Sequence, residues 1–125
     1  MEEERPGIVI IKERVDPAEL ARLVRLYFED MVKYVVDVRR SIVALGGELH
    51  ADAEQVLLED GSQQRDLWGA NYYPGAGPDG CIEYTALINI RPSQENRSME
   101  ITSAEVREQV RRLTFELIGS GEEPA

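Results

Sequence analysis

The stretch VKYVVDVRRSIVALGG, residues 32–47, decides the fold, because its pattern fits either one long helix or two strands. Its apolar residues continue the helical spacing of the preceding segment, so a single helix could run over 17–45 and stop at Gly46-Gly47. Both halves are rich in β-branched residues, which favour strands, and Arg39-Arg40-Ser41 can form a turn. A helix of about 30 residues is long for a compact domain. We favour a hairpin over 32–38 and 42–50, with the long helix as the alternative.

The segment before this stretch predicts a strand followed by a helix. Residues 7–12 contain IVII, a short apolar run typical of a buried strand. Asp16 then occupies an N-cap position, Pro17 the first helical position and Glu19 the capping-box position. One apolar stripe follows at helical spacing: Leu20, Leu23, Val24, Tyr27, Phe28 and Met31.

The segment after it predicts a second helix, a second hairpin and a last helix. Asp52 and Gln55 indicate the start of the second helix and Gly61 its end. Strands are expected over 67–73 and 81–91, joined by the glycine- and proline-rich loop 74–80. The last helix is expected to start with a capping box of Thr102 and Glu105, to carry an apolar stripe and to stop at Gly119. The stripe consists of Val106, Val110, Leu113 and Leu117.

The expected order of elements is therefore β-α-β-β-α-β-β-α. Hairpins imply a mostly antiparallel sheet with helices packed on it, which is the α+β class. We expect a single domain over 1–125, with an ordered core over about 7–119 and acidic, frayed termini.

Composition limits the classes of partner. The 24 acidic and 14 basic side chains give a net charge of −10, which disfavours binding to nucleic acids and acidic membranes. No apolar segment approaches the roughly 20 residues of a membrane-spanning helix, and the acidic N-terminus does not resemble a signal peptide. A single cysteine, Cys81, excludes an internal disulfide. We expect a cytoplasmic protein.

Three motifs carry a family resemblance: GGELHADAE (46–54), LLEDGSQQRDLWGANYYP (57–74) and INIRPSQENRS (88–98). In this order they resemble a prokaryotic family of short acidic proteins that is known only as a domain of unknown function. The resemblance covers about residues 8–118. It implies a stand-alone, cytoplasmic, single-domain protein, and it brings no catalytic residues with it.

The first candidate site is the trio Glu48, His50 and Asp52, which contains the only histidine. On a strand, residues two apart share a face, so Glu48 and His50 could face one pocket with Asp52 at its rim. Imidazole and carboxylates are common ligands of divalent metals, and histidine also suits general acid–base catalysis. The alternative is structural: Asp52 caps a helix, His50 is a hydrogen-bonded structural residue, and Glu48 is solvated or paired with an arginine.

The second candidate site is the polar segment from Asn89 to Arg97. Asn89 and Arg91 are expected on the polar face of a strand, and Arg97 follows in a loop. Two arginines with amide and hydroxyl groups could hold a carboxylate or phosphate. Alternatively, Arg91 pairs with Glu48 or Glu83 across the sheet.

The third candidate site is the aromatic stretch WGANYY, residues 68–73. Trp68 could stack on a planar ligand with Asn71 beside it, although aromatic residues on a strand are more often core. Gly69 inside a strand indicates a bulge or the close approach of another group. Cys81 has no partner at a spacing typical of nucleophilic catalysis.

Three functions follow from these sites. The one we favour is a binding module for a small anion or a divalent metal, with a pocket around His50, Asn89 and Arg91. The second is an enzyme with His50 as general acid or base and Arg91 or Arg97 holding an anionic substrate. The third is a structural or interaction protein, with a homodimer formed through an exposed sheet face or the aromatic rim. The pattern specifies no cofactor.

Overall fold

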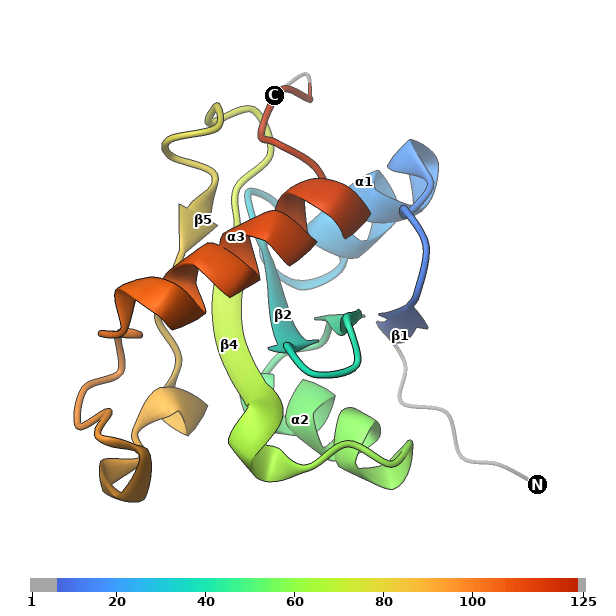
Figure 1. The fold of residues 1–125 in the computed structure, drawn as a ribbon. Coiled ribbons are helices and arrows are strands. Elements are labelled where there is room, and N and C mark those ends of the chain that lie inside the picture. The colour runs from blue at the N-terminus through green and yellow to red at the C-terminus, as the bar shows by residue number, and fades with distance from the viewer. Residues whose placement is uncertain (1–6, 124–125) are drawn as a thin grey trace.

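The computed structural model describes residues 7–123. Five strands form one antiparallel sheet in the order β1-β3-β2-β4-β5 (Figure 1). The strands are β1 (Ile8–Ile11), β2 (Val32–Asp37), β3 (Ile42–Gly46), β4 (Leu67–Tyr72) and β5 (Ile82–Glu83). The helices are α1 (Pro17–Tyr27), α2 (His50–Glu59) and α3 (Ala104–Leu117), with short 3₁₀ turns η1 (Gln64–Asp66), η2 (Leu87–Asn89) and η3 (Pro92–Gln94). The predicted α+β class, single domain and element order are confirmed.

The deciding stretch forms the favoured hairpin rather than the long helix. β2 and β3 pair antiparallel from Tyr34 opposite Leu45 to Asp37 opposite Ile42. The turn between them is held by Asp37, whose Oδ1 accepts hydrogen bonds from the backbone N–H groups of Arg39 and Arg40, at 2.9 and 2.8 Å. This local bonding is typical of aspartate in turns. The predicted end at residue 50 is wrong, since β3 ends at Gly46.

Helices cover both faces of the sheet and create two cores. On one face, α1 and α3 pack on alternate residues of the central strands; this core includes Leu20, Leu23, Tyr34, Val36, Leu45, Trp68, Tyr72, Val110 and Leu113. On the other face, α2 packs through Ala53 and Leu57 on a smaller core formed with Val35, Ala44 and Leu67. Trp68 and Tyr72 are therefore interior residues. They do not form the exposed aromatic rim through which a homodimer was expected.

The predicted strand over 81–91 is mostly wrong. β5 contains only Ile82–Glu83, and residues 84–86 then pair with 99–101 instead of continuing beside β4. Beyond them the chain coils into η2 and η3. The alternating pattern placed Ile90 on the apolar face of a strand, yet Ile90 is 42% exposed whereas Asn89 and Arg91 are buried, because the chain turns here instead of running along one strand. Asn89 and Arg91 are consequently not on the polar face of a strand.

Three predicted helix caps are also wrong in detail. α2 begins at His50 with Leu49 at the N-cap, so Asp52 lies in the first turn, where a carboxylate is favoured by the helix dipole. Glu19 binds Arg22 rather than closing a capping box. The N-cap of α3 is Ser103, whose Oγ accepts from Val106 N at 3.2 Å, because Asn96 holds the preceding threonine instead.

Part of the segment for which the sequence predicted fraying is bonded to the rest of the fold. Gly77 N donates to Gly121 O at 2.7 Å, and Gly121 N donates to the hydroxyl of Tyr72 at 2.8 Å. These bonds fix the segment after α3 against the end of β4. The remaining fraying predictions concern residues 1–6 and 124–125, which lie outside the described residues. Within 7–123, no helix is long and apolar enough to cross a membrane.

Candidate functional site

His50 sits at the start of α2, beneath the end of β4. Its side chain is 8% exposed, and its Nε2 lies 2.9 Å from the carbonyl oxygen of Ala70. A carbonyl only accepts, so Nε2 carries the proton and Nδ1 is the acceptor of the neutral ring. The histidine therefore docks α2 onto β4, which is the structural role that was the alternative to catalysis.

A row of polar side chains crosses the sheet beside this histidine. Lys33, Asn71 and Glu83 are register partners on β2, β4 and β5. Asn71 is 7% exposed and its Nδ2 donates to Glu83 Oε1 at 2.8 Å; the hydroxyl of Tyr73 donates to the same oxygen at 3.1 Å. The Oδ1 of Asn71 is buried and has no hydrogen-bond partner within 7–123.

The electrostatics around His50 favour the neutral ring. Burial lowers the pKa of His50 below its ordinary 6.5, and the positive charge of Lys33 lowers it further. The Ala70 carbonyl and the side chains of Asn71 and Glu83 raise the pKa, but less than burial lowers it. General acid–base catalysis by His50 stays a prediction, and Nδ1 is the atom left to perform it.

Asn89 acts as a substitute for the strand that is missing beside β4. It is fully buried; its Oδ1 accepts from Gly69 N at 2.9 Å and its Nδ2 donates to Gly69 O at 3.0 Å. The Nδ2 also donates to Met99 O at 3.1 Å. One amide thus makes the two bonds that a neighbouring strand would make at Gly69.

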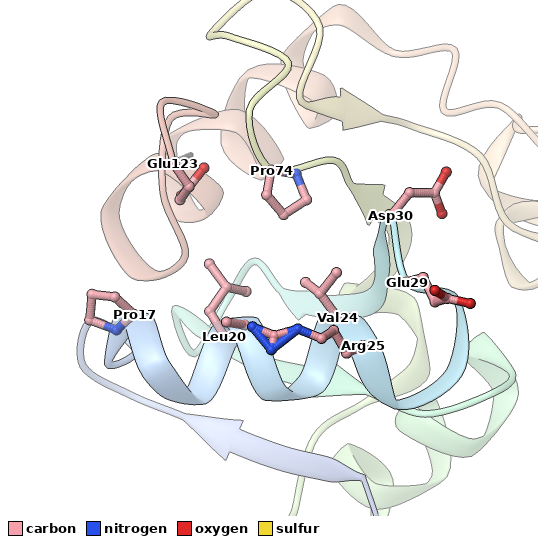
Figure 2. A pocket seen from close by; sticks show the side chains of 9 residues that line it. Pro17, Leu20, Val24, Arg25, Glu29, Asp30, Pro74 and Glu123 are labelled. Carbon is pink, nitrogen blue, oxygen red and sulfur yellow. The ribbon is translucent and has the colours of Figure 1, made fainter. Parts of the chain in front are cut away.

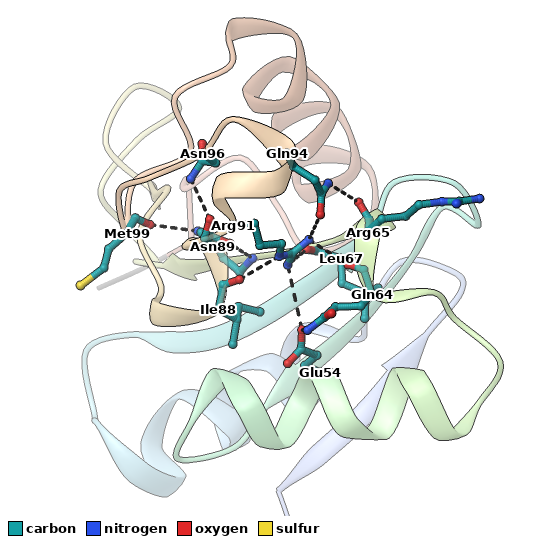
Figure 3. Close-up of polar contacts among 11 residues, drawn as sticks. Glu54, Gln64, Arg65, Leu67, Ile88, Asn89, Arg91, Gln94, Asn96 and Met99 are labelled. Carbon is teal, nitrogen blue, oxygen red and sulfur yellow. Dashed lines mark hydrogen bonds and ion pairs between the residues drawn. The ribbon is translucent and has the colours of Figure 1, made fainter.

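Arg91 is fully engaged by the fold (Figure 3). Its guanidinium lies 4.6 Å from the centre of the Trp68 ring and is 8% exposed. Its N–H groups reach acceptors in every direction: the carbonyl oxygens of Ile88, Gln64 and Leu67, Oε1 of Gln94, and Oε2 of Glu54, the last as an ion pair at 4.0 Å. Guanidinium has five N–H donors, and four hydrogen bonds to the fold occupy four of them. The one that remains is too few for the bidentate grip on an anion that the sequence indicated, and Glu54 lies beside it.

The expected ion-pair partners of Arg91 are also replaced. Glu54 of α2, rather than Glu48 or Glu83, is its acidic neighbour. Burial lowers the pKa of Arg91 and the Glu54 charge raises it. The arginine therefore joins α2, the start of β4 and the turn after η2.

The structure also places three further residues that the sequence analysis singled out. Arg97 is exposed on the loop before α3. Trp68 is covered by Arg91, so its face is not open to a planar ligand. Gly69 confirms the predicted close approach: an added Cβ would lie 2.7 Å from Ala86 Cβ and 3.2 Å from the His50 ring.

The first candidate trio does not converge on one point. β3 has ended before Glu48, which is exposed, and His50 and Asp52 lie in the first turn of a helix. The same-face argument for a metal therefore fails. Within 7–123, no group of three or more histidine, cysteine, aspartate or glutamate side chains could hold a metal ion. Cys81 is fully buried, and burial raises the pKa of its thiol.

A cleft of about 580 Å³ opens on the other face of the molecule, over α1 (Figure 2). Figure 2 shows Leu20 and Val24 rising from α1 toward Pro74 and Glu123, which face them from across the cleft. We call this space the α1 cleft; it is lined by Pro17, Leu20, Ala21, Val24, Arg25, Glu29, Asp30, Pro74 and Glu123. Its volume lies within the range of about 300–1,000 Å³ typical of ligand pockets.

The position of Glu123 in this cleft is set by Tyr72. The Tyr72 hydroxyl accepts from Gly121 N and donates to Glu123 Oε2 at 2.7 Å. Burial raises the pKa of Tyr72, and the hydrogen bond to Glu123 raises it further, so the phenol keeps its proton near neutral pH. An added Cβ at Gly119 would collide with both groups, which is why glycine suits this position. The other carboxylate oxygen, Oε1, is buried and has no hydrogen-bond partner within 7–123.

Sequence reasoning missed this cleft entirely. Its walls come from α1, the turn at Glu29 and Asp30, the end of β4 and the tail beyond α3. One local signal existed: Asp16-Pro17 fixes where α1 begins. The pairing of Tyr72 with Glu123 spans 51 positions and leaves no spacing pattern.

Comparisons with known proteins agree with the resemblance seen in the motifs. A family model described as "Protein of unknown function (DUF5674)" matches residues 9–117. Neither the curated proteins nor the solved structures yielded a match. The matched span includes all three motifs and most of the 125 residues. The chain therefore belongs to the DUF5674 family of proteins of unknown function.

Proposed function

We propose that this protein is a small-ligand-binding module and that the ligand occupies the α1 cleft. The observation that carries the proposal is the cleft itself: about 580 Å³, with an apolar floor and a polar rim. A largely apolar pocket with a few convergent polar groups is the usual form of a small-molecule site.

The side chains that the sequence indicated as ligand-binding already bond to the fold, which favours the α1 cleft over them as the ligand site. The donors of Arg91 and the amide of Asn89 are engaged within the fold. In contrast, Leu20 and Val24 present apolar surface to the cleft, and Arg25, Glu29 and Asp30 stand at its rim.

Filling the cleft tests the proposal. Ala21 lines it and Ala18 does not, although both belong to α1. We expect Ala21→Trp to abolish binding of small molecules that stabilise the wild type, and Ala18→Trp to leave that binding unchanged. The assay is thermal unfolding against a panel in which one apolar body carries an amine, a hydroxyl or a carboxylate. A ligand at 100 times its Kd adds about 2.7 kcal/mol.

Two results would contradict the proposal. One is the absence of any shift for the wild type across the panel. The other is an equal shift for both tryptophan variants, which would place the ligand outside the α1 cleft.

A further inference from the structure

We infer that this protein forms a homodimer in which strand β1 of one copy pairs antiparallel with β1 of a second copy. The sequence suggested a homodimer through a sheet face or an aromatic rim, and the surface inferred here is a sheet edge instead. None of the residues that line the α1 cleft belongs to β1, so this inference is independent of the proposed function.

The two edges of the sheet differ in how well they are protected against such pairing. β5 is an edge strand of two residues, one of which is Glu83. Short edge strands and charged side chains prevent edge-to-edge association. β1, at the opposite edge (Figure 1), has four residues and contains no charge and no proline. Within 7–123, β3 is its only partner strand, so the outer side of β1 is open to another strand.

The side chains of β1 select an apolar partner strand. Val9 and Ile11 pack on the core beneath α1 and α3, and Ile8 and Ile10 pack on the core beneath α2. All four side chains are only half-buried, because both cores end at this strand. A strand added here would continue both cores and would therefore need apolar side chains on both of its faces. The sequence IVII meets this requirement, so a second copy of β1 fits the edge.

The symmetry of a homodimer restricts the register of this pair. When a two-fold axis relates two antiparallel strands, a residue lies opposite itself or opposite a residue an even number of positions away, so that like faces of the sheets join. An axis at Val9 pairs positions whose numbers sum to 18, and positions 7–11 are all uncharged. An axis at Ile10 would instead place Lys12 opposite Ile8. The axis at Val9 is therefore the favoured one.

Two exposed side chains of α1 extend the surface of this edge. Leu26 and Tyr27 are 45% and 41% exposed, and both lie over Gly7: an added Cβ there would come within 2.8 and 2.9 Å of them. With the axis at Val9, Gly7 lies opposite the partner's Ile11, whose side chain points to the same side of the sheet. That isoleucine would cover apolar surface that a single copy exposes to water.

The charges on the two sides of IVII favour the antiparallel direction. Residues 2–5 contain three glutamates and one arginine, a net charge of −2, whereas Lys12, Glu13 and Arg14 have a net charge of +1. Antiparallel pairing of two copies brings net charges of opposite sign together at each end of the pair, and parallel pairing would bring like charges together. Such complementarity selects the orientation of a partner.

Sedimentation velocity of the full-length protein tests the inference. Four residues of strand and two flanking side chains give an interface at the small end of the size range, so we expect a Kd of roughly 1–100 μM. The protein should be monomeric well below about 1 μM and mainly dimeric at about 1 mM.

The matched variants place a charge on the two-fold axis. Like charges directly opposite one another destabilise a strand pair, so we expect Val9→Lys and Val9→Glu each to dimerise at least about tenfold more weakly than the wild type. An equimolar mixture of the two variants should dimerise again, because lysine then lies opposite glutamate. Leu87→Lys changes a residue of η2 that is 71% exposed, and it should dimerise as the wild type does.

Cross-linking provides a second measurement if the charged variants do not fold. Val9→Cys should form a disulfide between two copies under oxidation, because the two positions face each other across the axis. Ile10→Cys should do so at least about tenfold more slowly, because position 10 lies opposite the partner's Ile8 instead of itself.

Three results would overturn the inference. The first is a wild type that stays monomeric at about 1 mM. The second is a dimer that Val9→Lys leaves intact or that Leu87→Lys weakens equally, since such a dimer forms through another surface. The third is a mixture of the charged variants that stays monomeric, or equal cross-linking at positions 9 and 10, which refutes the antiparallel pair centred on Val9.

Discussion

Replacing Asn89 by alanine should destabilise the protein strongly, although this residue lies outside every strand and α-helix, at the end of the short 3₁₀ turn η2. The side chain is fully buried and makes three hydrogen bonds: two to the backbone of Gly69, at 2.9 and 3.0 Å, and one to Met99 O, at 3.1 Å. Alanine would leave Gly69 N and Gly69 O without these partners, whereas Met99 O keeps the hydrogen bond from Ala86 N. Each buried group that loses its partner costs about 1–3 kcal/mol.

The magnitude can be worked out from these bonds. Met99 O keeps its bond from Ala86 N, so only the two Gly69 groups are counted, at about 1–3 kcal/mol each. The expected loss is about 2–6 kcal/mol of a total unfolding free energy of about 5–15 kcal/mol. For a chain of this length, 1 kcal/mol corresponds to roughly 3–6 °C, so the midpoint should fall by at least about 6 °C.

The assay is thermal and urea unfolding followed by circular dichroism, with Arg97→Ala as the matched control. Arg97 belongs to the same motif but is exposed, and its variant should stay within about 0.5 kcal/mol of the wild type. Hydrogen exchange of the Gly69 amide adds a local readout, because that amide donates to Asn89. If Asn89→Ala unfolds together with Arg97→Ala and Gly69 keeps its protection, the amide is not acting in place of a strand.

Four further predictions concern single sites. Gly69→Ala should lower the midpoint, because its Cβ would lie 2.7 Å from Ala86 Cβ; a midpoint equal to that of the wild type would show that Ala86 moves freely. Burial lowers the folded-state pKa of His50 below 6.5, so the neutral histidine stabilises the fold above pH 6.5, and this stabilisation is lost as the pH falls below that value. His50→Asn should therefore flatten the slope of the unfolding free energy against pH between about pH 6.5 and 5. An unchanged slope would show that other groups cause it. Cys81 is fully buried with a raised pKa, so a thiol reagent should label it only after unfolding, and labelling of the native protein at the unfolded rate would contradict its burial. Ser103→Ala should cost about 1 kcal/mol by removing the cap of α3, measured by urea unfolding, with Thr102→Val as the comparison expected to act through Asn96 instead.

Local sequence patterns predicted the structure correctly where the stabilising contacts lie within a few residues of one another in the sequence. The hairpin of β2 and β3 was predictable because Asp37 closes its turn within a few residues and because β-branched residues fill both strands. The start of α1 at Pro17 follows from the same kind of local constraint. The correct order of elements is the sum of such short-range signals.

Local patterns failed where a distant segment supplied the partner. Residues 84–86 alternate like a strand, yet they pair with 99–101 because Asn89 already satisfies the backbone of Gly69. The motif INIRPSQENRS (88–98) suggested an anion site. In a sequence, arginine and amide side chains give the same pattern whether they bind a ligand or the protein backbone. The acceptors around Arg91 decide between a ligand site and a structural role, and two of them, Gln64 O and Leu67 O, come from 27 and 24 positions away.

The candidate site was unpredictable for a related reason. The α1 cleft combines Pro17, Pro74 and Glu123, which come from three segments that meet only in the folded protein. Pro17 and Pro74 each belong to a local motif, but neither motif indicates that the two residues meet, and Glu123 belongs to none of the three motifs. The sequence motifs instead mark the residues that hold the sheet edge together.

Mapping small-molecule binding on the amide NMR spectrum would decide most directly whether a ligand binds in the α1 cleft or at residues 88–98. A fragment set would be titrated into the labelled wild-type protein, and the residues whose amides shift would be located. We predict shifts at Leu20, Ala21, Val24 and Asp30, around the α1 cleft. Shifts concentrated instead between 88 and 98, with the cleft unaffected, would show that the INIRPSQENRS motif is the ligand site and that its internal bonds yield to a ligand.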